Sequence, residues 1–161
     1  MLTKIDDAVQ SIQNQASDKD IDLIMAVPPN IGMVKADRLR FAQVMTNLIS
    51  NAYKYSPAGS KVIISALKQK QHVQIAVSDN GMGISEADQA SLFTKFFRAY
   101  NASTREQSGT GLGLYITEHL IEAYNGAIWT ESTIGEGTIF TSHGSRQICY
   151  QVMMPLHFIQ S

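Results

Sequence analysis

Two asparagines and a lysine follow one another at helical spacing in RLRFAQVMTNLISNAYKYS, residues 38–56. At about 100° per residue, Asn47, Asn51 and Lys54 share one side of a helix. Asparagine is a poor residue for a helix interior, because its side chain competes for backbone hydrogen bonds. Its amide oxygen is a hard ligand that suits Mg²⁺, and a lysine ammonium suits phosphate. The three residues therefore indicate either a magnesium and phosphate groove or an ordinary solvated polar face.

Glycines at every second position open another candidate segment, GTGLGL at residues 109–114, which leads into an apolar helical pattern. Glycines at a helix start leave the first N–H groups, and the positive end of the helix dipole, accessible to an anion. The segment lacks the Gly-Lys-Ser/Thr ending of a P-loop and the βαβ context of a dinucleotide fingerprint. It predicts either a phosphate site or a flexible hinge before a helix.

Two shorter motifs add polar and cationic side chains. DNGMG, residues 79–83, follows a predicted strand. Asp79 could there accept a hydrogen bond from an exocyclic amine such as that of adenine, although the motif also suits a simple tight turn. In LFTKFFR, residues 92–98, we expect the phenylalanines to pack in the core, while Lys95 and Arg98 face outward beside a polar loop.

The elements that must position these residues follow from periodicity and turn signals. Helices are expected over residues 3–16, 38–55 (with Asp37 as N-cap), 84–97, and from the glycine-led segment to about 125. Strands are expected over residues 20–27, 61–69, 72–79, 127–132, 137–142 and 147–154, the second and third forming a hairpin. This order predicts an α+β fold, a two-layer sandwich with helices on one face of a mixed, mostly antiparallel sheet.

Length and composition set broad limits. The 161 residues suit one globular domain spanning residues 1–161, and the net charge of −1 gives no general attraction to nucleic acid or anionic membrane. Four histidines and one cysteine are too few and too scattered for a zinc site. Cys149 alone cannot form an internal disulfide, which fits a cytoplasmic location. No apolar run has membrane-spanning length and no signal peptide is recognisable, although a longer parent protein could be membrane-anchored.

Taken together, the four motifs resemble the boxes of bacterial sensor histidine kinases in order and spacing. NLISNAYKYS resembles the N box, DNGMG the first glycine box, LFTKFF the F box, GTGLGL the second glycine box, and GEGTIF, residues 135–140, the closing strand. The resemblance covers about residues 5–155. It implies the catalytic and ATP-binding domain, with the Bergerat fold of the superfamily that includes DNA gyrase, heat-shock chaperone ATPases and MutL-type repair proteins. The dimerisation and sensor domains would lie outside this chain.

The resemblance also implies roles for individual residues, with ATP and Mg²⁺ as ligands. Asn51 matches the magnesium ligand, and Asn47 and Lys54 match residues near the phosphates, so these three are the expected catalytic residues. Asp79 matches the residue that reads the adenine amino group. The other expected nucleotide-binding residues border the base, face the phosphates or belong to an ATP lid at about residues 98–110: Tyr55, Gly81, Gly83, Ile84, Arg98, Gly109, Thr110, Gly111, Leu112, Gly113, Leu114 and Thr138.

The implied reaction is transfer of the γ-phosphoryl group to a histidine on a separate dimerisation domain, with a response regulator receiver domain as an indirect partner. The family's phospho-acceptor motif is absent from this sequence, so the chain alone should not autophosphorylate. Hydrolytic relatives carry a glutamate where this chain has Asn47, which cannot take a proton, so little ATP hydrolysis is expected. Two alternatives stay open: a serine/threonine kinase of the same superfamily, of the anti-sigma-factor type, and a non-catalytic nucleotide-binding regulatory module.

One segment departs from the family pattern. The family usually reaches a Leu-Pro pair a few residues after the equivalent of Phe140, but here residues 141–154 intervene before Pro155. We expect a turn at residues 143–145 and an extended hairpin with residues 147–154. This hairpin would be either a surface elaboration or an added sheet edge that contacts a neighbouring domain or a second chain.

Overall fold

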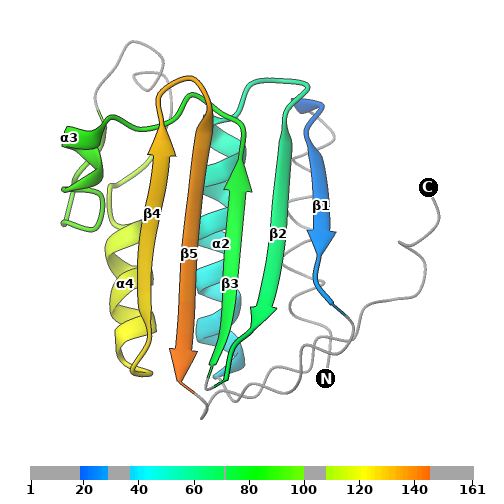
Figure 1. Cartoon of the computed structure of the whole chain (residues 1–161). Coiled ribbons are helices and arrows are strands. Elements are labelled where there is room, and N and C mark those ends of the chain that lie inside the picture. Colours follow the sequence, from blue (N-terminus) through cyan, green and yellow to red (C-terminus); the bar gives the residue numbers. More distant parts are fainter. Residues whose placement is uncertain (1–18, 29–36, 71, 100–107, 146–161) are drawn as a thin grey trace.

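The computed structural model describes residues 19–28, 37–70, 72–99 and 108–145, and these form two layers. One layer is a sheet of five strands in the order β1-β2-β3-β5-β4, and helices α2 and α4 lie against one of its faces (Figure 1). β1 pairs with β2 in parallel and all other pairs are antiparallel. The predicted sandwich is confirmed. The strands are β1 (Asp22–Ala26), β2 (Lys61–Lys68), β3 (His72–Asp79), β4 (Ala127–Thr133) and β5 (Gly137–Ser145).

Helix α2 (Arg38–Tyr55) supplies one wall of the core and matches its predicted bounds. The Asp37 carboxylate caps its start by accepting hydrogen bonds from the N–H groups of Leu39 and Arg40, at 2.9 and 3.1 Å. Its apolar stripe packs on the sheet, where Leu48 and Val77 are fully buried. Because the stripe fixes the rotation of the helix, Asn47 and Asn51 lie on the side next to it, where both are half-buried. The core members shared between α2 and the sheet are Val44, Met45, Leu48, Ile49, Ala52, Val62, Ile64, Val77 and Phe140.

The helix predicted over residues 84–97 is much shorter in the structure. Only α3 (Glu86–Gln89) is helical, capped by the Ser85 hydroxyl, and turns follow it. The N–H groups of Leu92 and Thr94 bond to carbonyls three residues earlier, and Phe96 has a φ of 61°. A non-glycine residue in this left-handed region interrupts a helix. The prediction of one long helix was wrong because Leu92, Phe93 and Phe97 reach the core through successive turns. The expectation that all the phenylalanines pack in the core was also wrong, since the Phe96 side chain is 70% exposed.

The glycine-led helix is confirmed as α4 (Gly113–Glu122). It ends where Asn125 adopts a φ of 55° and the N–H of Gly126 bonds to the Ile121 carbonyl at 3.1 Å. α4 packs beside α2 on the same face of the sheet (Figure 1). The start of α4 therefore lies next to the middle of α2.

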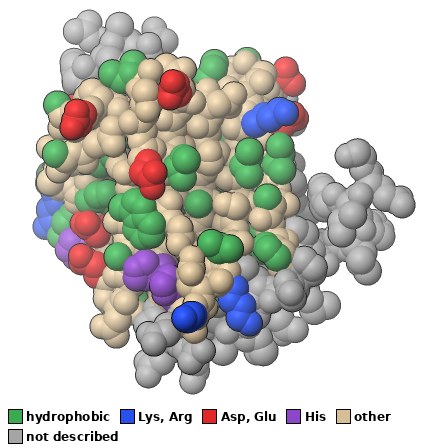
Figure 2. Space-filling model, viewed as in Figure 1, with side chains coloured by type: hydrophobic (Ala, Val, Ile, Leu, Met, Phe, Trp, Pro, Cys, Tyr) green, Lys and Arg blue, Asp and Glu red, His purple; other side chains and the backbone are tan. Residues whose placement is uncertain are grey.

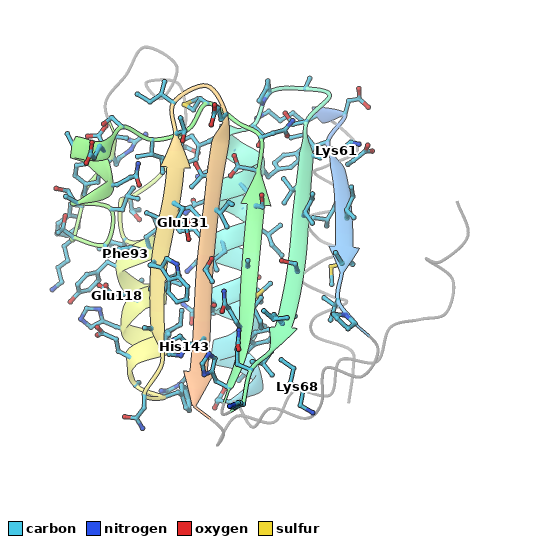
Figure 3. All side chains as sticks on the ribbon, viewed as in Figure 1. Lys61, Lys68, Phe93, Glu118, Glu131 and His143 are labelled. Atoms are coloured by element: carbon cyan, nitrogen blue, oxygen red, sulfur yellow. The ribbon has the colours of Figure 1, made fainter. Side chains whose placement is uncertain are left out.

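The opposite face of the sheet carries a mixture of polar and apolar side chains over the described residues (Figure 2). Glu131 and His143 project from this face on β4 and β5 (Figure 3). Strand β5 continues through residues 143–145, where His143 pairs with Gln74 and Ser145 with His72. The predicted turn at these residues was wrong, because pairing with β3 extends the strand. The expected helix over residues 3–16 and strand over residues 147–154 lie outside the described residues.

Candidate functional site

A cavity of about 390 Å³ lies between α2, the loop after β3, the start of α4 and the start of β5. It brings together residues from four separate motifs. Fourteen of the sixteen predicted site residues line it: Asn47, Asn51, Lys54, Tyr55, Asp79, Gly83, Ile84, Arg98, Gly109, Thr110, Gly111, Gly113, Leu114 and Thr138. Gly81 and Leu112 are not among the lining residues, although each is next in sequence to a residue that is. Of the expected lid, residues 100–107 lie outside the described part of the chain.

Asp79 ends β3 on the floor of the cavity and is 9% exposed. Its carboxylate accepts hydrogen bonds from the backbone N–H groups of Gly81, at 2.9 Å, and of Thr138. Burial nevertheless raises the pKa of Asp79 above its ordinary value, because the lost hydration outweighs these two bonds. A buried carboxylate with acceptor capacity left over is suited to a ligand that carries an N–H donor.

The glycines beside Asp79 permit close backbone contacts. A Cβ on Gly81 would lie 2.5 Å from the Tyr55 carbonyl oxygen, which belongs to the last turn of α2. Gly83 has a φ of 71°, and a Cβ there would lie 2.0 Å from the Thr133 carbonyl oxygen. Both positions therefore require glycine. They hold the loop after β3 between the end of α2 and β4.

The polar side of α2 faces the start of α4. The Asn47 amide donates hydrogen bonds from Nδ2 to the Gly113 carbonyl at 3.3 Å and to Thr117 Oγ1 at 3.1 Å. Thr117, which is completely buried, donates in turn to the Gly113 carbonyl at 2.9 Å. With both Nδ2 protons used, Asn47 keeps its Oδ1 atom as an acceptor. The first asparagine is thus locked to α4, and the two helices form one unit.

Lys54 lies one turn beyond Asn51, and its ammonium donates a hydrogen bond to the Ser108 carbonyl. The start of α4 that lies across from it has no acidic residue in its first turn, and its N-cap, Leu112, supplies no side-chain acceptor. Asp79, at the end of β3, is the only acidic side chain among the described residues that line the cavity, so α2 and α4 contribute none. A cation and the positive end of a helix dipole both attract an anion. This combination favours a bound anion.

Several lining or supporting residues were missed by the sequence reasoning. The polar ones act through contacts between distant segments, and the apolar ones are core residues that also face the cavity, so neither group has a local signal. They are Ser50, Met82, Gln89, Leu92, Phe97, Ala99, Ser108, Thr117, Ser132 and Phe140.

The fold and the residues of the cavity suit a nucleotide-binding domain, and the family match identifies which kind. The chain belongs to the family of histidine kinase-, DNA gyrase B-, and HSP90-like ATPases, whose profile matches residues 36–145. Sensor histidine kinase WalK of Bacillus subtilis (strain 168) is 37% identical over 126 residues, 77% of this chain and 21% of the relative. Sensor-like histidine kinase SenX3 of Mycobacterium tuberculosis (strain ATCC 25618 / H37Rv) is 37% identical over 139 residues, 86% of this chain and 34% of the relative.

Solved structures agree with this assignment. The catalytic domain of histidine kinase ThkA superimposes with a TM-score of 0.77 at 28% identity, covering 89% of this chain and 91% of that domain. The chain is thus similar to a catalytic domain over nearly its full length, whereas it spans only about a fifth to a third of the length of the curated relatives above. The domain seen here is the catalytic and ATP-binding domain of the sensor histidine kinase type. Among the residues described, no helix is long and apolar enough to cross a membrane.

Proposed function

We propose that this domain binds Mg-ATP and donates the γ-phosphoryl group to a histidine on a separate dimerisation domain of the same parent protein. The observation that carries the proposal is a single cavity that joins a buried carboxylate, Asp79, to a cationic and amide-lined end built from α2 and the start of α4. A nucleotide has the same two ends, a base with N–H donors and a chain of phosphates. Residues 1–161 would act as one catalytic unit on the cytoplasmic side.

At the base end, Asp79 would accept a hydrogen bond from the adenine amino group. The two N–H groups that already donate to the carboxylate keep it in position, and burial excludes competing water. Tyr55, Ile84 and Thr138 line the cavity around this point. An adenine ring would be held by apolar contacts and oriented by the carboxylate, which is the usual composition of a small-molecule site.

At the phosphate end, Lys54 and the first turn of α4 would neutralise the phosphate charge. Gly109 and Gly113 keep this approach open, because a Cβ there would lie 3.6 Å from Lys54 Nζ and 3.9 Å from Asn47 Oδ1, respectively. Gly111 is required instead by the nearby Phe96 backbone. Leu112 and Gly113 would donate their backbone N–H groups to phosphate oxygens, and Arg98 and Thr110 would meet the outer phosphates. Phosphoryl transfer depends mainly on such positioning and charge neutralisation.

Among the described residues, the only protein groups placed to bind Mg²⁺ in this cavity are side-chain amide oxygens, so the nucleotide would have to supply further ligands. Within the described ranges, no group of three or more His, Cys, Asp or Glu side chains could hold a metal. Asn51 lines the cavity between Asn47 and Lys54, so its Oδ1 is the expected protein ligand, with phosphate oxygens and water completing the shell. When bound, Mg²⁺ would supply charge neutralisation of the β- and γ-phosphates.

Asn47 favours transfer over hydrolysis. Its Nδ2 atom is committed to Gly113 and Thr117, and an amide cannot accept a proton, so the position offers no general base to activate water. The γ-phosphoryl group would therefore await an external histidine. A response regulator would act after that step; one similar structure is of histidine kinase ThkA in complex with response regulator protein TrrA, with a TM-score of 0.73 at 26% identity.

Calorimetric titration with a non-hydrolysable ATP analogue, with and without Mg²⁺, tests the binding step. We expect binding to the wild-type chain that responds to Mg²⁺ and is weakened about 10- to 100-fold in Asp79→Asn. The loaded domain is then offered a histidine-containing dimerisation domain and, separately, a serine-containing anti-sigma-factor substrate. Transfer to histidine alone would support the proposal, and transfer to serine would favour the superfamily's other kinases. Binding without any transfer would favour a regulatory module.

A further inference from the structure

Ser132 on β4 occupies an unusual position next to the base end of the cavity. β3, β5 and β4 lie side by side, and their register places Asp79, Thr138 and Ser132 in one row across the three strands. Thr138 is 5% exposed and lines the cavity, whereas Ser132 stands behind it. Ser132 thus supports the cavity wall without lining the cavity itself.

The Ser132 hydroxyl makes three contacts, and only one arrangement of protons makes all three of them hydrogen bonds. It accepts a hydrogen bond from the Ile84 N–H at 2.8 Å, and it donates to the Gly137 carbonyl, also at 2.8 Å. A carbonyl oxygen can only accept, so the single Ser132 proton is used there. The third contact, 3.0 Å between Ser132 Oγ and Thr138 Oγ1, must then be donated by Thr138.

This arrangement fixes the polarity of Thr138. A threonine hydroxyl has one proton, and once that proton points at Ser132, only lone pairs remain for any other partner. Thr138 can therefore accept a direct hydrogen bond from a ligand but cannot donate one to it. Asp79, its neighbour across the strands, presents acceptors as well.

We propose that Ser132 is a specificity-positioning residue that makes Thr138 an acceptor toward the base and so favours a 6-amino purine over a 6-oxo purine. The inference deepens the proposed ATP-binding function and rests on it. A 6-amino group brings a donor to this wall, whereas a 6-oxo group brings an acceptor that meets lone pairs. A ligand that leaves buried polar groups of the site unpaired binds more weakly, so the site discriminates against the 6-oxo purine.

The backbone around Ser132 keeps this geometry rigid. Gln89 on α3 donates from Nε2 to the Ile84 carbonyl at 2.9 Å and to the Ser132 carbonyl at 3.0 Å, which clamps the loop after β3 onto β4. Gly137 has a φ of 122°, and a Cβ there would lie 2.0 Å from the Asp79 carbonyl oxygen. The Gly137 carbonyl that takes the Ser132 proton is therefore held by a backbone that only glycine permits.

The test measures affinities for ATP and for inosine triphosphate, by displacement of a fluorescent ATP analogue in the presence of Mg²⁺. Ser132→Ala frees the Thr138 proton to turn toward the ligand, so we expect the preference for ATP to fall by roughly fivefold, the value of one neutral hydrogen bond. Ser132→Thr retains the hydroxyl and should keep the wild-type preference. Ser65→Ala, which removes a serine hydroxyl from β2 away from the cavity, is the matched control and should leave both affinities unchanged.

A double-mutant cycle with Thr138→Val isolates the mechanism, because valine has no hydroxyl to orient. In that background Ser132→Ala should no longer change the preference. Equal loss of affinity for both nucleotides in Ser132→Ala would show a purely structural role and overturn the inference. A wild-type chain that binds ATP and inosine triphosphate equally would overturn it as well, whereas failure of the wild-type chain to bind either nucleotide would overturn the proposed function together with it.

Discussion

At the scale of single residues, Asp79 has opposite effects on binding and on stability. Burial raises its pKa, so the folded state holds a proton more tightly than the unfolded chain does. At neutral pH the folded state therefore contains a desolvated charge, which lowers stability, and this penalty disappears as the pH falls through the raised pKa and then below the unfolded value. Asp79 therefore lowers the free energy of unfolding at neutral pH, as expected for a residue whose role is to bind a ligand.

Asp79→Asn should consequently weaken ATP binding while leaving the fold intact. We expect a loss of about 10- to 100-fold in affinity, the value of a hydrogen bond to a charged group. The melting temperature at pH 7 should equal or exceed that of the wild type, and the difference should vanish at pH values below the ordinary range of an aspartate. Calorimetric binding and thermal melts across pH measure both effects. A clearly lower melting temperature at pH 7 would contradict this account of the site.

At the scale of elements, the end of α2 is held by a residue far away in sequence. The Lys19 ammonium donates hydrogen bonds to the carbonyls of Tyr53 and Lys54, both at 3.0 Å, and lies 5.4 Å from the centre of the Tyr53 ring. The Met82 N–H donates a hydrogen bond to the Tyr55 carbonyl at 3.3 Å. The last carbonyls of a helix need such partners, and a cation also matches the dipole.

Lys19→Met should remove these bonds while keeping the aliphatic stem. We expect a loss of about 1 kcal/mol in the free energy of unfolding, from the charged hydrogen bonds and the helix dipole together. Lys68→Met, at an exposed position on β2, is the control and should change stability little. Urea denaturation measures both variants. Equal effects would mean that the Lys19 contacts contribute nothing specific.

The junction between the F-box segment and α4 depends on Gly111. It has a φ of 72°, and a Cβ there would lie 2.7 Å from the Phe96 carbonyl carbon and 2.8 Å from the Phe96 Cα. The Phe96 N–H also bonds to the Gly111 carbonyl at 3.0 Å. The backbones at Phe96 and Gly111 are therefore in close contact just before α4 begins.

Gly111→Ala should be more harmful than an equally strained substitution in open space. Gly59 has a φ of 79°, and a methyl group added there would meet nothing within 4 Å, so Gly59→Ala should cost only the conformational penalty of about 1–2 kcal/mol. Gly111→Ala adds a backbone clash, so we expect a larger loss of stability and a displaced phosphate end. Melting temperatures and ATP affinity compare the two variants. Similar losses in both would show that the close approach of Phe96 is unimportant.

At the scale of the whole molecule, ligand and partner should have separable effects. Because ATP would bind only the folded domain, a concentration 100-fold above its dissociation constant should stabilise the chain by about 2.7 kcal/mol. The loaded chain alone should show no phosphohistidine, and adding a dimerisation domain in trans should produce it. Thermal melts and phosphoryl-transfer gels test the two statements. Label retained on this chain without the added domain would contradict the proposed division of labour.

The sequence by itself determined the helix of residues 38–55, the hairpin of β2 and β3, and the glycine-led start of α4, because periodicity, caps and turn residues act over a few neighbouring positions. It also predicted most of the residues that line the cavity. The tertiary structure alone decided that α3 ends at Gln89, that β5 runs through residues 143–145, and that Ser132 and Lys19 support the site. These outcomes depend on contacts between residues far apart in sequence, such as Ile84 and Ser132, separated by 48 residue numbers, or Lys19 and Tyr53, separated by 34. Which distant groups meet depends on packing of the whole chain, and no local pattern encodes it.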